Sequence, residues 1–512
     1  MALALRQADR NVIPRWRDFA TTVELGELTE PASRRTPKPL QFELGSLEED
    51  WANNRSLSFA ADLLCAASLR SATEVVREAA NFVLDSGTDL GADHPLIRLA
   101  KQTLQHDVDK DRQNRLIEAY TATGMNNLIS SHRRSLKIFP RDAILWVDLS
   151  LLYAMQGLSE KARRAMLVAI SLEPENRFVL RSASRLFIHL NEPDRAHKLL
   201  RRSNLVKCDP WIISAEIATA LAAKLPVFSV DQGIRTAAGS NFDHRQTTEL
   251  STALASLELR DGNRQKARKH LRNALRKPNE NSLAQAKWVS RQMNDLRSGI
   301  SVTEFQVERS FEAAAWEATL NRDWTSAAEN SIGWLKDQPF SSRPAQLGAH
   351  VTGALLENFD AAEKITKLGL NANRGEHLLQ LSLAFIYGST NRLELAREHL
   401  AQIRGPMINA VEIAVIADHG LIKFREGDEE AGRAFYQAAV ETALDRNENV
   451  VAASALIYWA REEVRSRTPV AGDVLARAAS GVKAQGSALI EGPFLIERIE
   501  REFALSKVKA TP

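Results

Sequence analysis

The sequence predicts an all-α protein, an α-solenoid built from stacked helical hairpins. Three observations predict this class. Alanine and leucine are abundant, whereas aromatic residues make up 6 % of the 512 residues, which favours helices over strands. Residues 143–176 have the pattern of two amphipathic helices joined by a tight turn. The order of large and small residues in that stretch returns about every 34 residues along the chain.

The hairpin at 143–176 follows from the spacing of its apolar residues. Trp146, Leu149 and Tyr153 recur at intervals of three and four and therefore form one face of a first helix. Gly157 permits a tight turn before the second helix. Ala162 is small and is expected where the two helix backbones cross. Neither helix buries its apolar stripe alone, so each pair must stack on another pair.

The same pattern recurs in further units. Ala196 follows Ala162 by 34 residues, and Ala361 follows Ala327 by 34. The other positions that repeat the order of glycine, small and large residues are Pro140, Phe187, Gly262, Ala267, Leu271, Ala274, Pro339, Leu383, Tyr387, Ala396, Leu400, Gly427, Gly432, Tyr436 and Ala439. The stretches 211–240 and 281–305 are irregular. The second contains Ser301-x-x-Glu304, a capping-box pattern that predicts the start of a new helix.

This series resembles the tetratricopeptide repeat, and the chain resembles a divergent, bacterial-type member of that superfamily. Ser150 stands where the family usually has glycine, and Met166 where it usually has an aromatic residue. The positions that match in register are Trp146, Leu149, Tyr153, Gly157, Ala162, Ala169 and Pro174. The resemblance implies a right-handed superhelix in which first helices line a concave groove and second helices form the convex surface.

Three regions are expected along the chain. Residues 1–46 are predicted to be an extended or partly disordered arm, because the stretch LTEPASRRTPKPL has three prolines and mixed charge. Within it, IPRWRDF carries Trp16 and Phe19 and either packs onto the array, which we favour, or docks into a partner. Residues 47–505 are predicted to be one continuous solenoid, with a first hairpin in the stretch 56–84. Residues 506–512 are predicted to be a polar tail.

Composition bears on the compartment. The chain has a net charge of +3 and two cysteines, which favours a reducing compartment and argues against a disulfide framework. The N-terminus lacks the features of a signal peptide, and no apolar run is long enough to span a bilayer. We therefore expect a cytoplasmic protein that does not associate with a membrane.

The sequence contains no motif that indicates catalysis. Glycine-rich phosphate loops, His-Glu-x-x-His and Cys-x-x-Cys are absent, and the eleven histidines are scattered. The acidic pairs 429–430 and 462–463 have the setting of solvated helix faces. We therefore predict a non-enzymatic protein with no cofactor and no metal.

The groove implied by the resemblance is the predicted site for a protein partner, which makes the protein a scaffold or adaptor, as a subunit of a larger complex. Residues on its first helices that are expected to anchor the partner are Arg181, Arg185, His189 and Arg260. A groove of this kind suits a helix or an extended segment with an apolar face and an acidic flank.

An alternative function follows from the charge distribution. Residues 132–207 carry fifteen Lys or Arg against seven Asp or Glu, whereas 357–463 carry seventeen acidic residues against eleven basic ones. A basic stripe is predicted on the convex surface, formed by Lys161, Arg164, Lys198, Arg201, Lys266 and Lys269. This stripe is suited to nucleic acid, or to contacts of a regulatory or sensor subunit within a multiprotein complex. Nucleic acid is the less favoured partner, because aromatic residues for base stacking are sparse there.

Overall fold

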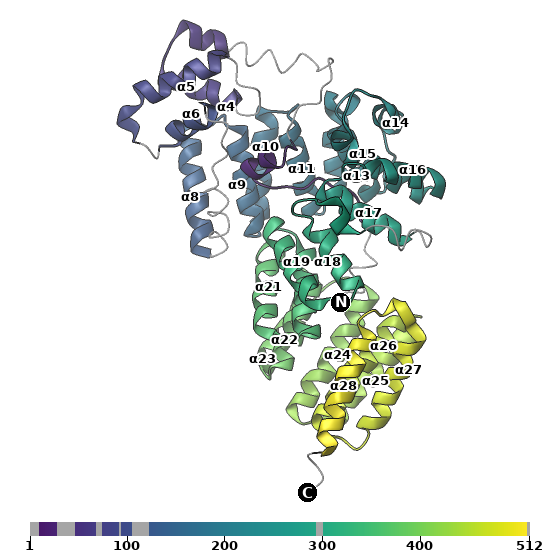
Figure 1. Ribbon diagram of the computed structural model, residues 1–512. Helices are drawn as coiled ribbons and strands as arrows, with labels where there is room; N and C mark the ends of the chain where they lie inside the picture. Colours follow the sequence, from purple (N-terminus) through teal and green to yellow (C-terminus); the bar gives the residue numbers. More distant parts are fainter. Residues whose placement is uncertain are drawn as a thin grey trace. The chain divides into compact units, whose positions relative to one another are not determined.

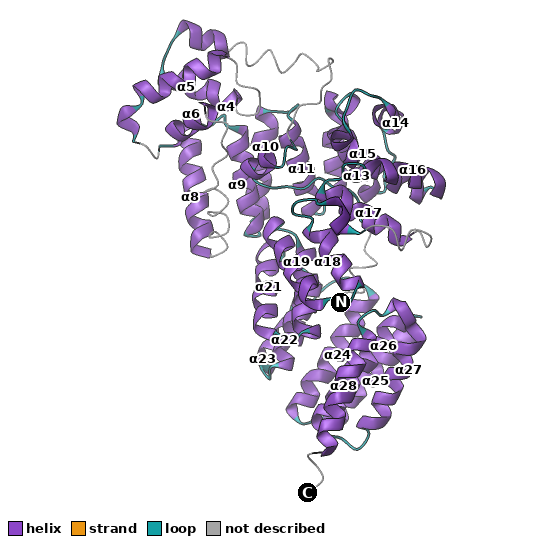
Figure 2. Cartoon of the chain, in the orientation of Figure 1, coloured by secondary structure: helices purple, strands orange, loops and turns teal. Residues whose placement is uncertain are grey.

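The computed structural model describes residues 10–27, 47–67, 74–91, 94–104, 122–292 and 301–508. Within these ranges all regular structure is helical, and Figure 2 shows helices and loops without a strand. The all-α prediction is therefore confirmed for the described residues. The chain divides into two compact units, an N-terminal unit at Arg10–Ser310 and a C-terminal unit that starts at Phe311. Because the chain divides into two units, a single continuous array from 47 to 505 stays a prediction.

The N-terminal unit is a series of helical hairpins (Figure 1). Its helices are α2 (Phe19–Glu24), α4 (Leu57–Ala67), α5 (Glu74–Ser86), α6 (Pro95–Leu104), α8 (Ala122–Ile138), α9 (Ala143–Met155), α10 (Ser159–Leu172), α11 (Arg177–His189), α12 (Pro193–Arg202), α13 (Pro210–Ala223), α14 (Val230–Ala238), α15 (His244–Arg260), α16 (Arg264–Ala274) and α17 (Glu280–Gln292). From α9 onward, each first helix contacts its own second helix and the next first helix. This nearest-neighbour packing is the pattern of a helical-repeat array. The hairpin expected at 56–84 is also present as α4 and α5, which pack together.

The hairpin of α9 and α10 shows why the sequence pattern works. Ala162 and Ala169 are fully buried at the helix crossing. Ser150, at the usual glycine position, is buried and its hydroxyl donates a hydrogen bond of 2.8 Å to the carbonyl of Ala162. Asp142 begins α9 by accepting a hydrogen bond from the amide of Leu145. Serine therefore replaces glycine at this contact by linking the two helices directly.

Replacing Ala162 with tryptophan is expected to lower the free energy of unfolding by about 1–3 kcal/mol. The methyl group of Ala162 is buried between the two helices, and an indole ring there forces them apart. Thermal melting followed by circular dichroism measures the effect. An unchanged melting temperature would contradict the pairing of α9 with α10.

The two irregular stretches have different outcomes. At 211–240 the second helix is the short α14, where Gly233 takes the position of the small residue. A Cβ atom on Gly233 would lie 3.3 Å from side-chain atoms of Ile213 and of Leu250. At 301–305 the prediction of a new helix is wrong. Val302–Phe305 forms a single 3₁₀ turn, and Ser301 pairs with the hydroxyl of Thr303 rather than capping a helix.

The C-terminal unit repeats the same arrangement of hairpins. Its elements are α18 (Phe311–Leu320), α19 (Trp324–Asp337), α20 (Ser342–Ala349), the π-helical turn η5 (His350–Leu355), α21 (Phe359–Ala372), α22 (His377–Ser389), α23 (Leu393–Ala401), α24 (Asn409–Glu426), α25 (Glu429–Asp445), α26 (Asn449–Ser466), α27 (Ala471–Gln485) and α28 (Gly492–Val508). The last helix extends to Val508, three residues beyond the predicted end of the array at 505.

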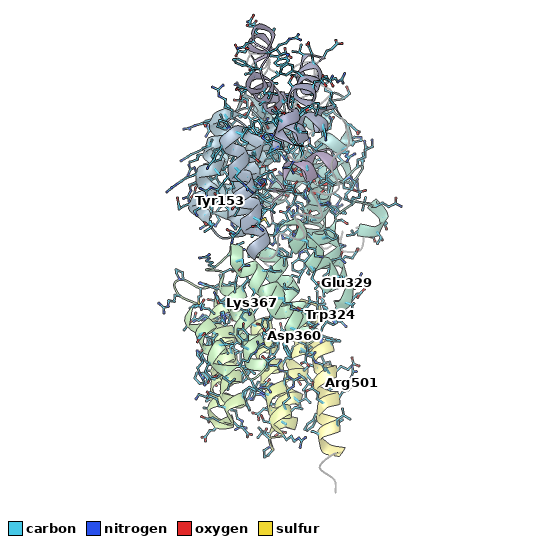
Figure 3. All side chains as sticks on the ribbon, turned by 90° about the vertical axis from the view of Figure 1, so that its left-hand side faces the viewer. Tyr153, Trp324, Glu329, Asp360, Lys367 and Arg501 are labelled. Atoms are coloured by element: carbon cyan, nitrogen blue, oxygen red, sulfur yellow. The ribbon has the colours of Figure 1, made fainter. Side chains whose placement is uncertain are left out.

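The last helix of the C-terminal unit packs back onto its earlier elements. Trp324, labelled in Figure 3 at the start of α19, lies against Phe494 of α28 with 5.7 Å between the ring centroids. The guanidinium of Arg498 donates hydrogen bonds to the carbonyls of Ala354 and Leu355 in η5. These contacts fix α28 against η5. The helix that begins as α20 continues into η5 with π-helical geometry.

Candidate binding surfaces

Residues 10–27 lie on the first helices of the N-terminal unit. We call the surface formed there by α9, α11, α13, α15 and α17 the first-helix face. The segment is non-helical up to Asp18 and then forms α2. Val12 joins a buried apolar cluster with residues of α13 and α15, Trp16 is 1 % exposed, and Phe19 packs edge-on against Phe178 at 5.3 Å. The expectation that IPRWRDF packs onto the array is confirmed by these contacts.

The first-helix face holds the main chain of the segment as well as its side chains. Four hydrogen bonds join side chains of the face to backbone groups of the segment. Three side chains donate to carbonyl oxygens: Gln285 to that of Arg10 (2.6 Å), Asn281 to that of Ile13 (3.0 Å) and Arg245 to that of Leu25 (2.9 Å). The carboxylate of Asp148 accepts the fourth bond from the amide of Phe19 (3.0 Å). Such bonds fix the position of an extended chain without depending on its side chains.

A buried cluster of charges links the segment to α11, α15 and α17. Arg17 donates to Glu280 at 2.8 Å and to Glu27 at 3.1 Å, and both carboxylates are buried. Arg181 donates to Glu249 at 2.9 Å and lies 4.0 Å from Glu27. Burial raises the pKa of Glu27 to about 7, although the charge of Arg17 opposes the rise. The charged side chains of this cluster therefore pair with one another and have little contact with water.

The structure places the predicted partner anchors in different settings. Arg181 is 4 % exposed and stacks over the ring of Trp211, so no partner reaches it while the segment is in place. Arg185 and His189 are half-buried further along α11, and burial, followed by the charge of Arg185, lowers the pKa of His189 to about 4. Arg260 is exposed at the end of α15 and pairs with Asp261. Their role in binding a partner stays a prediction.

Sequence reasoning missed the polar residues that contact the segment. These are Asp148, Arg245, Glu280, Asn281 and Gln285. A signal was available, because Asn281 and Gln285 are four residues apart and therefore share one face of a helix. The buried charges of the segment are of both signs, namely Arg10, Arg17, Asp18 and Glu27, and the acidic flank expected of a partner stays a prediction.

A second candidate site is a cavity of about 130 Å³ in the C-terminal unit. It lies among η5 and the first helices α22, α24 and α26, and six alanines form much of its wall. Its other lining residues are His350, Leu378, Leu381, Ser382, Phe385, Ile386, Ile413, Asp418, Tyr436, Val451, Ser454 and Tyr458. A π-helical turn is uncommon and often occurs at functional sites, and here it supplies one wall.

Asp418 and Tyr458, which line this cavity, have raised pKa values. Burial raises the pKa of Asp418 to about 8, with the charge of Arg461 opposing, and burial raises the pKa of Tyr458 to about 12. Arg461 is 1 % exposed beside the cavity and stacks over the rings of Phe385 and Tyr458. Its Nε donates to Glu462 at 2.8 Å, but its two terminal nitrogens have no hydrogen-bond partner in the part of the chain that the structure describes.

The prediction that Glu462 and Glu463 are solvated is wrong. Both side chains are buried to 1 % exposure or less in α26. Glu462 pairs with Arg425 and Arg461, and Glu463 accepts hydrogen bonds from Arg433. Buried carboxylates require such compensation, and arginines on neighbouring helices supply it here.

Asp418→Asn is expected to gain stability over the native chain as pH rises from about 4 to about 8. The folded chain with Asp418 binds a proton that the unfolded chain releases in this range, so the contribution of the aspartate falls as pH rises towards 8. Asparagine stays neutral and shows no such loss. Melting temperatures of both proteins across this range test the prediction, and a constant difference between them would contradict it.

The six residues of the predicted basic stripe are all exposed, on α10, α12 and α16. Lys161 lies over the ring of Tyr153, Arg201 over that of Phe228, and Lys266 is 3.9 Å from Glu258. Arg164, Lys198 and Lys269 make no ion pair with a described residue. The stripe is therefore accessible, while its function stays a prediction.

The described residues contain no group of three or more His, Cys, Asp or Glu side chains placed to hold a metal ion. Among the described helices, none combines the length and the apolar composition needed to cross a membrane.

Comparisons with known proteins leave the family open. No family model matches the chain, and no curated protein matches it. Among solved structures, the human IFIT1 dimer with PPP-AAAA is 14 % identical with a TM-score of 0.31, covering 90 % of this chain and 94 % of its own. Yeast Tom70 is 13 % identical with a TM-score of 0.27, covering 79 % and 96 %. A circular tandem repeat protein is 15 % identical with a TM-score of 0.16, covering 96 % of each chain. Scores this low carry no argument, so the proposals below rest on the contacts of this chain.

Proposed function

We propose that the protein is a non-enzymatic scaffold that binds an extended segment of a partner protein on the first helices of its hairpins. The observation that carries this proposal is the seating of residues 10–27 on the first-helix face. There, hydrogen bonds to the main chain and buried side chains hold an extended chain against successive hairpins. This is a recurring way in which proteins recognise peptides.

The cavity of the C-terminal unit is the proposed site for the partner. It is formed by the first helices α22, α24 and α26, which correspond to the helices that hold residues 10–27 in the other unit. Its alanine walls and the rings of Phe385 and Tyr458 suit an apolar anchor side chain. With a pKa near 8, Asp418 is largely protonated at neutral pH and is able to donate a hydrogen bond to a backbone carbonyl of the partner.

Filling the cavity tests this proposal. Ala417 and Ala455 line the cavity, so Ala417→Phe and Ala455→Phe are expected to occupy the space of the anchor. Ala401 is exposed at the end of α23, so Ala401→Phe is the matched control. Partners are captured by cross-linking from extracts of the native host and quantified by mass spectrometry. We expect the main partner to be lost with the first two variants and kept with the control. The same partners with all three variants would contradict the proposal.

Nucleic-acid binding through the basic stripe is a second candidate, favoured by the exposure of all six of its residues. Contacts to phosphates release counterions, so affinity should fall steeply with salt. A gel shift with single-stranded RNA at low and at moderate salt tests it, with Lys198→Glu and Arg201→Glu combined as the variant. Absence of a shift at low salt would remove this candidate.

A further inference from the structure

We propose that the first-helix face of the N-terminal unit is a recognition site for an extended peptide that carries an aromatic anchor and two arginines. Residues 10–27 occupy this site as an intramolecular ligand, and a partner segment of the same chemistry displaces them. This proposal rests on the proposed function in one respect, namely that first helices bind extended chains. It concerns a different surface from the cavity and is tested separately.

The segment is placed like a ligand rather than like a part of the array. Helices α9 to α17 contact one another through their own hairpins, and this packing does not pass through residues 10–27. The segment adds only α2, a helix of six residues. Removing it therefore leaves the hairpin contacts in place and exposes the first-helix face.

The chemistry of the partner follows from what the face recognises. Arg10 donates to Gln285 and Asn281, and Arg17 donates to Glu280, so the face accepts guanidinium groups at two positions of the segment that are seven residues apart. Trp16, next to Arg17, is 1 % exposed. The face also binds main-chain carbonyls of the segment, and these bonds do not depend on which side chains lie between the two arginine positions.

The charge of the face supports the same choice. Without the segment, the face presents the buried carboxylates of Asp148, Glu249 and Glu280 together with the guanidinium groups of Arg181 and Arg245. The carboxylate of Glu280 attracts an arginine and disfavours an acidic side chain at the same position. A segment with arginines and an aromatic residue at the positions of Arg10, Arg17 and Trp16 is therefore the expected partner.

Competition is built into the chain. The segment belongs to the same chain as the face, so it is a covalently tethered ligand. A tethered ligand has a high effective concentration, so an external peptide must compete against it. Weakening the segment at its own residues is therefore expected to open the face to an external peptide.

The test uses the full chain and a fluorescent synthetic peptide of residues 10–27. In the released variant, Trp16→Ala and Arg17→Ala are combined, which removes the anchor and one buried arginine from the tethered segment. We expect this variant to bind the peptide at least about tenfold more tightly than the native chain, measured by fluorescence anisotropy. Val23 is 38 % exposed in the same segment, so Val23→Ala is the control and should match the native chain.

Three further variants, one of the peptide and two of the protein, locate the binding. A peptide that carries the same Trp16→Ala and Arg17→Ala changes should not bind. Adding Asn281→Ala and Gln285→Ala to the released variant should weaken peptide binding about tenfold or more, because both side chains hold the main chain of the segment. Ala417→Phe in the other unit should leave peptide binding unchanged, which separates this test from that of the cavity.

Hydrogen exchange on the native chain provides a measurement that needs no variant. Saturating peptide should speed exchange at the amides of residues 10–27, because the tethered segment is displaced. If the released variant keeps its helical signal and still binds no more tightly than the native chain, the proposal is overturned. A native chain that forms concentration-dependent dimers with exchanged segments would also overturn it, because the partner would then be a second copy.

Discussion

Glu249→Ala is expected to lower the free energy of unfolding of the N-terminal unit by about 3–5 kcal/mol, the largest loss we predict for a single change. Glu249 is 1 % exposed and accepts hydrogen bonds from Arg181, Asn279 and Asn281. Its removal leaves the guanidinium of Arg181 buried, with Glu27 at 4.0 Å as its nearest remaining carboxylate. The cost arises from the uncompensated charge rather than from the lost volume.

Hydrogen exchange of the amides in α11 and α15 measures this effect within the N-terminal unit. Glu160→Ala is the matched control, because Glu160 pairs with Arg163 at an exposed position. Exposed pairs contribute little, so we expect less than about 1 kcal/mol from the control. Equal effects of the two changes would show that the buried charge cluster does not stabilise the unit.

Arg461→Met is expected to act in the opposite direction and raise the free energy of unfolding by about 1–3 kcal/mol. Among the described residues, the two buried terminal nitrogens of Arg461 have no hydrogen-bond partner, which is unfavourable. Methionine fills a similar volume between Phe385 and Tyr458 without that cost. Glu462 keeps its ion pair with Arg425 at 2.9 Å, so no new unpaired charge is created.

Urea denaturation compares Arg461→Met with the native chain, and Arg501→Met, at an exposed position of α28, is the control. Stabilisation together with loss of partner capture would indicate that Arg461 is retained for binding at the expense of stability. A strongly destabilised Arg461→Met protein would contradict the account of this cluster.

The hairpins were predictable because their signal is local. The apolar periodicity of α9 and α10 and the small residues at their crossing depend on residues close in sequence. The hairpin of α13 and α14 was harder to recognise, because Gly233 replaces the alanine and Lys224, with φ of 55°, ends the first helix where the 143–176 hairpin has Gly157. Gly233 allows the same close helix contact as alanine, and Lys224 adopts the same left-handed backbone conformation as Gly157, but both residues change the sequence pattern.

The binding surfaces were less predictable because they depend on contacts between distant residues. Arg10 meets Gln285 across 275 positions in sequence, and neither residue type indicates the other. Glu462 and Glu463 look like surface residues until the arginines of neighbouring helices are placed beside them. The predicted anchor Arg181 is on the expected helix, but its carboxylate partner Glu249 lies two hairpins further along the chain.

Photo-cross-linking from position 13 tests most directly whether the first-helix face holds the extended segment. Ile13 is partly buried beside the apolar cluster of α13 and α15, so a photoreactive amino acid in its place should reach both helices. The account predicts intramolecular cross-links to peptides from Pro210–Ala223 and His244–Arg260, and their loss when the synthetic peptide is added in excess. Cross-links only to other regions, or links unaffected by the peptide, would contradict it.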